Sequence, residues 1–139
     1  MEALGETPIT LTEPDVGRLG SLLCTRVGLA YRSEARRLRG ELRRARVVRA
    51  MSVPPDVVTM NSTVCFEDVG AGASRSATLV YPWRAHERST VNVLSPLGTV
   101  LLGLRVGDLV AWTLDDGAAK VLRVIALPYQ PEAAGHWHL

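Results

Sequence analysis

The stretch that most constrains the fold covers residues 91–108, with the sequence VNVLSPLGTVLLGLRVGD. Its first residues suit a strand, which ends at Ser95 and Pro96 because proline cannot donate a hydrogen bond to a sheet. Proline fits the first turn of a helix and serine caps one, so a short helix should follow at once. Four apolar residues then recur at helical spacing and need a core to cover them (Leu97, Val100, Leu101 and Leu104). Gly103 and Gly107 allow a tight exit into the next strand.

Composition limits the class of protein. The chain has 139 residues, 47% of them hydrophobic, which is enough for a packed core and excludes global disorder. No apolar run approaches the roughly 20 residues of a membrane helix, and the acidic first residues do not resemble a signal peptide. We therefore expect a cytoplasmic protein with no membrane partner. Cys24 and Cys65 have no further cysteines beside them, so we expect two reduced, buried thiols.

Charge is distributed unevenly along the chain. Residues 26–49 hold nine arginines and two glutamates, a net charge of +7, although the whole chain carries only +2. The segments before and after this basic stretch are mildly acidic. Such a block marks a separate unit that faces a negative partner or a negative part of its own chain.

Two helices are expected before residue 50. Thr12 is suited to cap the first, which should continue to about Thr25 with Pro14 in its first turn. The second is expected over residues 31–48, with Ser33 as its possible cap. Its apolar positions follow a heptad pattern (residues 31, 35, 38, 42 and 45). With Gly28 as the turn between them, the two helices predict a short antiparallel hairpin. Two arrangements remain open: a projecting arm, or helices packed on the rest of the chain with a solvated basic face.

The periodicity changes after the sequence VPPD at residues 53–56, because two prolines end the helix. We therefore place an N-terminal helical hairpin at residues 1–52 and a second domain at residues 53–139. The expected strands of this second domain cover residues 63–67, 76–81, 90–94, 109–114 and 119–127. Glycine-containing turns at residues 70–73 and 115–117 should join two of the strand pairs. The predicted class is α+β, with an antiparallel sheet covered by one short helix.

Candidate catalytic and metal-binding patterns are weak. His136 and His138 could bind a metal, but a structural zinc needs four ligands and only two are in sight. Asp115 and Asp116 precede a glycine, which is ordinary turn chemistry. Ser95 has no base placed near it, so helix capping explains it. No nucleotide-binding glycine motif is present. We expect no catalytic residue, no metal site and no cofactor.

The basic helix permits three interpretations: a solvated face, contact with an acidic protein surface, or direct contact with nucleic acid through phosphates. Against the last, no helix-turn-helix, zinc or aromatic-platform motif accompanies the arginines, so nucleic-acid contact is expected to be weak. The candidate arginines of this basic arm are Arg26, Arg32, Arg36, Arg37, Arg43 and Arg44.

Four separated motifs in the same order give the chain a family resemblance. They are DVVTMNSTVCF, TLVYP, SPLG with LLGLRVGD, and YQPEAAG, preceded by a start that keeps Leu11-Thr12, Asp15 and Arg18-Leu19. Together they resemble the regulator of nucleoside diphosphate kinase (Rnk) family, which is similar to the Gre transcript-cleavage factors of bacterial RNA polymerase. The resemblance covers nearly the whole chain.

The resemblance implies a C-terminal domain with an FKBP-like fold that docks at the rim of the polymerase secondary channel. The serine-proline turn lies in the docking part of that fold, which corresponds here to Leu94, Ser95, Pro96 and Leu97. In Gre factors the hairpin enters the channel, and acidic residues at its tip help to hold a catalytic magnesium ion. The FKBP-like fold does not imply isomerase activity here, since a single Phe leaves little for an aromatic pocket.

The hairpin of this chain departs from that pattern. It is short, and its expected tip, residues 24–33, contains Arg26 and Arg32 but no Asp or Glu. Arginines cannot bring carboxylates to Mg²⁺. The sequence therefore predicts a non-enzymatic regulator that binds polymerase near the secondary channel without transcript cleavage. The alternative is a regulator of nucleoside diphosphate kinase that acts through direct protein contact.

Overall fold

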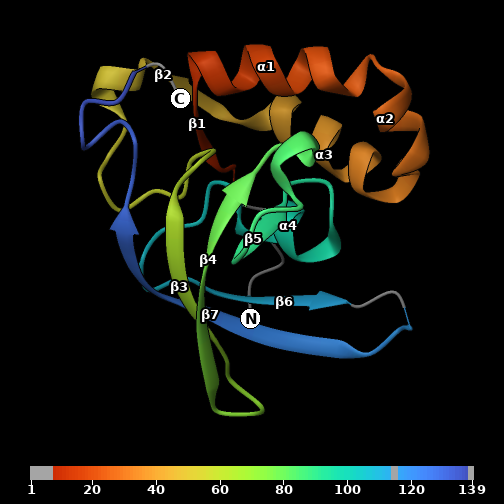
Figure 1. The fold of residues 1–139 in the computed structure, drawn as a ribbon, viewed down its shortest axis with the longest axis vertical. Helices are drawn as coiled ribbons and strands as arrows, with labels where there is room; N and C mark the ends of the chain where they lie inside the picture. The colour runs from red at the N-terminus through yellow and green to blue at the C-terminus, as the bar shows by residue number, and fades with distance from the viewer. Residues whose placement is uncertain (1–7, 114–115, 138–139) are drawn as a thin grey trace.

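A computed structural model describes residues 8–113 and 116–137 and confirms the α+β class. Three helices form an N-terminal layer: α1 (Glu13–Leu23), α2 (Arg26–Ala30) and α3 (Arg32–Arg44). They lie together at one end of the molecule, and the strands extend away from them (Figure 1). The short helix α4 (Pro96–Leu101) contacts both α3 and the sheet.

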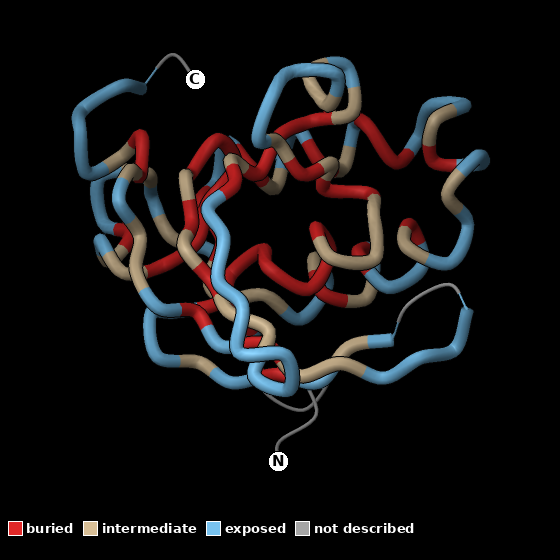
Figure 2. Tube along the Cα trace, turned by 60° about the horizontal axis from the view of Figure 1, so that its bottom comes forward, coloured by how far each residue is buried: buried red, intermediate tan, exposed pale blue. Residues whose placement is uncertain are grey.

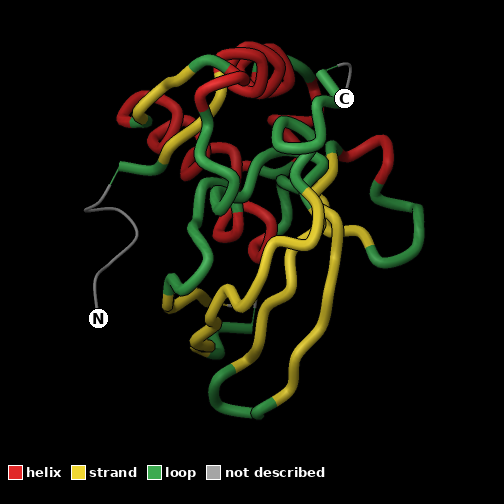
Figure 3. Tube along the Cα trace, turned by 90° about the vertical axis from the view of Figure 1, so that its left-hand side faces the viewer, coloured by secondary structure: helices red, strands yellow, loops and turns green. Residues whose placement is uncertain are grey.

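The main sheet has five strands in the order β5-β4-β3-β7-β6. Their bounds are β3 (Thr63–Asp68), β4 (Ala73–Val80), β5 (Thr90–Asn92), β6 (Leu109–Thr113) and β7 (Ala119–Tyr129). Figure 3 shows that the sheet is curled and that the β3–β4 hairpin points away from the helices. The expected strand positions are confirmed to within a few residues.

One pairing differs from the expected antiparallel sheet. β4 and β5 are parallel, with Thr78 opposite Thr90 and Leu79 opposite Val91. The connection between them contains the 3-10 helix η3 (Pro82–Arg84) and is long enough to reverse the chain, so that β5 runs alongside the last residues of β4. The other three pairings of this sheet are antiparallel.

The predicted second helix is too long. α3 ends at Arg44, and the following residues form β2 (Arg46–Val48), which pairs in parallel with β1 (Thr10–Thr12). Val47 and Val48 are β-branched and suit an extended strand better than a helix. Because β1 lies directly before α1, this small sheet ties the start and the end of the helical layer together.

The connection between α1 and α3 is a further short helix, where the sequence predicts only a turn at Gly28. A Cβ atom at Gly28 would lie 2.7 Å from the backbone oxygen of Leu23, so glycine permits the close approach of α2 to the end of α1. Thr12 caps α1 as expected, since its Oγ1 accepts a hydrogen bond from the amide of Asp15 at 3.2 Å. Ser33 does not cap α3, whose N-cap position is Tyr31.

A single hydrophobic core joins the helices to the sheet. Leu19 and Leu38 from the helices belong to the same cluster as Leu79 and Leu101 from the sheet and α4. Figure 2 shows the buried backbone passing through the middle of the molecule, where the two layers meet. The helices are therefore packed on the rest of the chain, and the projecting arm is not what the structure shows.

The stretch over residues 91–108 folds largely as the sequence predicts. Ser95 caps α4 with Pro96 in its first turn, and Gly103 and Gly107 adopt φ values of +80° and +98° after it. The expected burial of the two thiols is wrong. Both cysteines are free, but Cys24 is exposed and Cys65 is half-buried. Within the described residues, every helix is too short or too polar to cross a bilayer.

The glycine in the first turn of α4 generates a stability prediction. A Cβ atom at Gly98 would lie 2.0 Å from the Asn92 carbonyl oxygen, a backbone atom that cannot move aside cheaply. We expect Gly98→Ala to lower the free energy of unfolding by about 3 kcal/mol or more. Gly40→Ala is the matched control, because it lies inside α3 with nothing within 4 Å of the added methyl. It should raise stability by about 0.5–1 kcal/mol. Urea titrations measure both, and a Gly98→Ala variant as stable as the wild type would contradict the packing.

Candidate functional site

The turn before α4 is fixed by a closed set of short-range hydrogen bonds. Ser95 Oγ accepts from the Gly98 amide at 3.0 Å and donates to the Asn92 carbonyl oxygen at 2.7 Å. Asn92 Oδ1 accepts in turn from the Leu94 amide at 2.9 Å. These bonds, together with the fixed φ of Pro96, hold the turn in one conformation. A rigid turn binds a partner with little loss of conformational entropy.

The four residues predicted for docking do not all reach the surface. Leu94 is fully buried in the core, whereas Ser95, Pro96 and Leu97 are half-buried. Leu97 also packs against the core from its edge. The surface that a partner can reach is therefore Ser95 to Leu97, which we call the docking turn, and Leu94 anchors it from below. A docking role for this turn stays a prediction.

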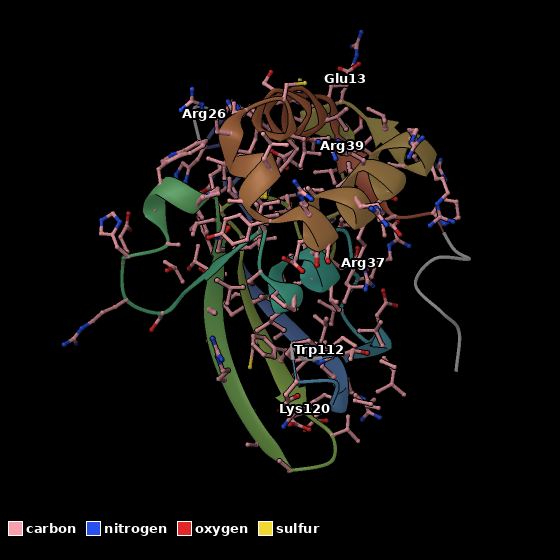
Figure 4. The ribbon with its side chains drawn as sticks, turned by 90° about the vertical axis from the view of Figure 1, so that its right-hand side faces the viewer. Glu13, Arg26, Arg37, Arg39, Trp112 and Lys120 are labelled. Atoms are coloured by element: carbon pink, nitrogen blue, oxygen red, sulfur yellow. The ribbon has the colours of Figure 1, made fainter. Side chains whose placement is uncertain are left out.

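One predicted arginine lies beside the docking turn. Arg37 of α3 and Pro96 of α4 line the same groove, of about 180 Å³, and Trp112 of β6 lines it as well. Figure 4 shows Arg37 and Trp112 on one side of the molecule. Sequence reasoning treats the arginine helix and the docking turn as separate units. The packing of α3 against α4 brings them together.

Three other predicted arginines lie along α3 together with a fourth that the sequence does not single out, and we call these four residues the arginine ridge. Arg32, Arg36 and Arg43 line a groove of about 300 Å³ together with Arg39, and no acidic side chain contributes to its lining. Arg39 also donates to the backbone oxygen of Leu23 at 2.9 Å, which places its guanidinium at the C-terminus of α1. The helix dipole favours a cation at that position.

The remaining two candidates are placed differently. Arg44 donates to Glu41 at 3.0 Å and so belongs to an ion pair within α3. Arg26 is exposed on α2 and lies away from Arg37 in Figure 4. The six arginines predicted for the basic arm therefore have four different surroundings. Three belong to the arginine ridge and Arg37 lies beside the docking turn. Arg44 is paired with Glu41, and Arg26 is exposed on α2. Contact of the ridge with nucleic acid stays a prediction.

A buried carboxyl group joins the two layers. Asp15, 3% exposed, accepts a hydrogen bond at 3.1 Å from the amide of Met60, in the segment before β3. Burial raises the pKa of Asp15 from its ordinary value of 3.8 to about 6, and the charge of Glu132 adds to this rise. The hydrogen bonds from Met60 and at Thr12, and the charge of Arg18, act in the opposite direction.

Tyr81 lies close to the same group. Burial raises the pKa of the Tyr81 hydroxyl, and the charge of Asp15 raises it further, whereas Arg18 lowers it. Glu132 accepts a hydrogen bond from Thr59 Oγ1 at 2.7 Å, beside the segment that carries Met60. This polar cluster therefore lies inside the junction of α1 with the sheet unit. Its geometry indicates a structural role.

Sequence reasoning overlooks Trp83, which lies on η3 and is 63% exposed. Together with one face of α1 it borders a groove of about 530 Å³. Trp112 is missed as well, because an alternating strand pattern does not reveal which groove a side chain borders. A tryptophan directly after a proline is the only local signal for Trp83, and it does not indicate exposure.

Metal ligands do not gather anywhere in the part of the chain that the structure describes, where no group of three His, Cys, Asp or Glu side chains could hold an ion. His136 Nδ1 forms a hydrogen bond with the Tyr129 hydroxyl, while His138 lies outside the described residues. Asp115 also lies outside them, and Asp116 accepts from the Ala118 amide at 2.9 Å, as expected of a turn residue.

Two family models match the chain in the order of its two layers. Residues 7–48 match the Rnk N-terminus, and residues 53–129 match the C-terminal region of the transcription elongation factors GreA/GreB. Fold and motifs thus define a protein with a Gre-type C-terminal region. Its N-terminal match makes the family specific: the chain belongs to the regulator of nucleoside diphosphate kinase (Rnk) family.

Individual relatives agree with this assignment. The chain is 48% identical over 103 residues to the regulator of nucleoside diphosphate kinase of Escherichia coli K12, covering 73% of this chain and 76% of the relative. It is 28% identical over 92 residues to GreA of Treponema pallidum (strain Nichols), covering 66% of this chain and 56% of the relative. A solved GreA/GreB structure from Nitrosomonas europaea superposes with a TM-score of 0.74 at 35% identity, over 89% of this chain and all of the other.

The raised pKa of Asp15 predicts a pH dependence of stability. A carboxyl with a higher pKa in the folded state holds its proton more tightly there, so folding gains from this group below pH 3.8. That gain is lost as the pH rises through about 6, and it corresponds to about 3 kcal/mol. Asp15→Asn keeps an oxygen acceptor for the Met60 amide but cannot ionise. Between pH 4.5 and 7, the wild type should therefore lose stability relative to Asp15→Asn.

Chemical denaturation at a series of pH values measures this difference. Glu13→Gln is the control, because it removes an exposed carboxyl group from the same helical turn and so separates a general effect of charge from the burial of Asp15. A constant offset between the wild type and Asp15→Asn would show that Asp15 titrates normally, and would contradict the burial argument.

Proposed function

We propose that the chain is a Gre-related regulator that binds bacterial RNA polymerase near the secondary channel through its docking turn. The observation that carries the proposal is the rigid Ser95–Pro96 turn, located inside the segment that matches the GreA/GreB C-terminal region. Family membership and the fold of the Nitrosomonas europaea structure support it. The docking turn offers a half-buried proline and leucine, while the Ser95 amide donates to the Asn92 carbonyl oxygen and the Ser95 carbonyl oxygen accepts from the Thr99 amide. Such a surface suits a protein partner.

We further propose that the chain does not promote transcript cleavage. The connection between α1 and α3 is the short helix α2, and residues 24–33 around it contain Arg26 and Arg32 but no acid. Magnesium requires oxygen ligands, and in nucleotide enzymes these are usually carboxylates. The helices are also short and packed on the sheet unit, with 11 residues in α1 and 13 in α3. A regulator of this kind acts by occupying a site on polymerase.

Binding to core RNA polymerase tests the docking turn. In the double variant Pro96→Ala/Leu97→Asp, the rigid proline is lost and a carboxylate replaces the apolar contact. We expect the Kd for core polymerase to rise at least about tenfold, which corresponds to ~1.4 kcal/mol. Val69→Asp is the matched control, since Val69 is also a partly exposed aliphatic residue but lies at the β3–β4 hairpin, far from α4. Unchanged affinity in a folded double variant would remove the docking turn from the proposal.

Cleavage assays test the second part. Backtracked elongation complexes with Mg²⁺ should cleave their transcripts at the intrinsic rate when this protein is added, even at saturating concentration. A GreA protein added at the same concentration is the positive control, and competition between the two would give slower cleavage. Stimulation by this protein alone would contradict a non-enzymatic role.

A second candidate function follows from the printed name of the Escherichia coli relative, a regulator of nucleoside diphosphate kinase. Under this alternative, the chain contacts the kinase directly and alters its activity or level. Light scattering of a mixture of the two purified proteins distinguishes the candidates. A stable complex with the kinase, in the absence of polymerase, would favour the alternative.

A further inference from the structure

The arginine ridge concentrates positive charge on one face of α3. Arg32, Arg36, Arg39 and Arg43 follow one another at steps of four, three and four residues, which places them on the same side of the helix. From the first to the last, the ridge measures about 16 Å at the rise of an α-helix. Like charges at these spacings repel one another and lower the stability of the helix that carries them. A negative ligand would remove this repulsion.

Three of the four guanidinium groups have no partner among the described residues. Arg32, Arg36 and Arg43 are exposed and form no hydrogen bond or ion pair with any residue that the structure describes. Other arginines of the chain form ion pairs with carboxylates (Arg44, Arg84, Arg105 and Arg123). The charge of the ridge is therefore not neutralised within the described part of the chain, and its donors are accessible to a ligand.

Arg39 gives the ridge a fixed point. Its Nη2 donates to the Leu23 carbonyl oxygen at 2.9 Å, so the guanidinium is oriented before any ligand arrives. A guanidinium has several N–H donors, and this hydrogen bond occupies one of them. Arg39 lines the groove, so its other donors can bind an anion there. A side chain that is already oriented loses less conformational entropy on binding.

The size of the groove indicates a compact ligand. Gly28 and Leu29 of α2 complete its lining, and its volume of about 300 Å³ is in the range of small-molecule sites. Several negative charges must fit into this volume to match the ridge. Neighbouring groups in a chain of phosphates share a bridging oxygen, whereas the phosphates of a nucleic acid are separated by sugars and the carboxylates of a peptide by its backbone. A short phosphate chain therefore matches the charge density best.

We propose that the arginine ridge binds a short chain of phosphate groups, as found in a nucleoside triphosphate or in inorganic triphosphate. Guanidinium groups form bidentate, charge-assisted hydrogen bonds with phosphate oxygens. Leu29 is 66% exposed at the edge of the groove, where the base of a nucleotide would pack against it.

This site is separate from the docking turn. Arg39 lies on the side of α3 that faces the end of α1, whereas Arg37 lines the groove beside Pro96 (Figure 4). The proposal goes beyond binding to polymerase and applies to the protein alone, so it stands or falls independently of the proposed function.

Isothermal titration calorimetry of the full chain with inorganic triphosphate and with ATP, both without Mg²⁺, tests the site. Arg36→Gln/Arg43→Gln removes two exposed, unpaired arginines of the ridge, and we expect the Kd for either probe to rise at least about tenfold. The thermal unfolding midpoint of this variant without ligand should equal or exceed that of the wild type, because repulsion along α3 is relieved.

Arg46→Gln/Arg49→Gln is the matched control. It removes the same charge from two exposed arginines that do not line the groove. At about 0.15 M salt, charges outside the site are largely screened, so the Kd should change less than about twofold.

The two probes distinguish the sources of the phosphate chain. Tighter binding of ATP than of inorganic triphosphate would assign the site to a nucleotide whose base contacts Leu29, and equal affinities would assign it to the phosphate chain alone. Three results would overturn the proposal. The first is no binding of either probe by the wild type, and the second is equal weakening in the ridge variant and the control. The third is tighter binding of a short single-stranded oligonucleotide or an oligoglutamate peptide of equal charge.

Discussion

The packing of α1 and α3 against the sheet unit determines where every candidate surface lies. Leu19 and Leu38 enter the same hydrophobic cluster as Leu79 and Leu101, and the buried Asp15 carboxyl accepts a hydrogen bond from the Met60 amide at the centre of the contact. Burial of apolar side chains supplies the main stabilisation of such a contact. The buried Asp15 carboxyl group makes the contact specific, because its hydrogen bond fixes the position of α1 relative to the Met60 amide. Without this contact, the groove lined by Arg37 and Pro96 and the groove bordered by Trp83 and α1 would not exist.

The sequence predicts those features that local chemistry determines. Ser95 and Pro96 specify a helix start almost regardless of context, and Thr12 with Pro14 does the same for α1. The alternation of the strands is equally local. The sheet registers, the parallel β4–β5 pair and the end of α3 depend on which strand is nearby, so they follow from tertiary contacts. Val47 is an example. The apolar periodicity predicts that the helix continues through Val47, but in the structure this residue lies in a strand that pairs with β1.

The candidate site also contains features that local sequence predicts and features that depend on tertiary contacts. The turn proposed for docking could be named from sequence because the family resemblance points to a motif that also caps a helix. Arg37 could be named as basic, but its place beside Pro96 required the packing of α3 on α4. Trp83 could not be identified, since exposure of an aromatic side chain depends on what the chain leaves uncovered. Burial of Leu94 was likewise out of reach of local reasoning.

A regulator with helices packed on its own sheet unit, no acid in the residues around α2 and a rigid docking turn would act by occupying polymerase. Hydrogen exchange of this protein, alone and in complex with core RNA polymerase, tests that claim most directly. The amides of Ser95, Leu97 and Gly98 should exchange more slowly in the complex, while those of the β3–β4 hairpin over residues 69–75 should be unaffected. Protection of the hairpin without protection of the docking turn would contradict the proposed mode of binding.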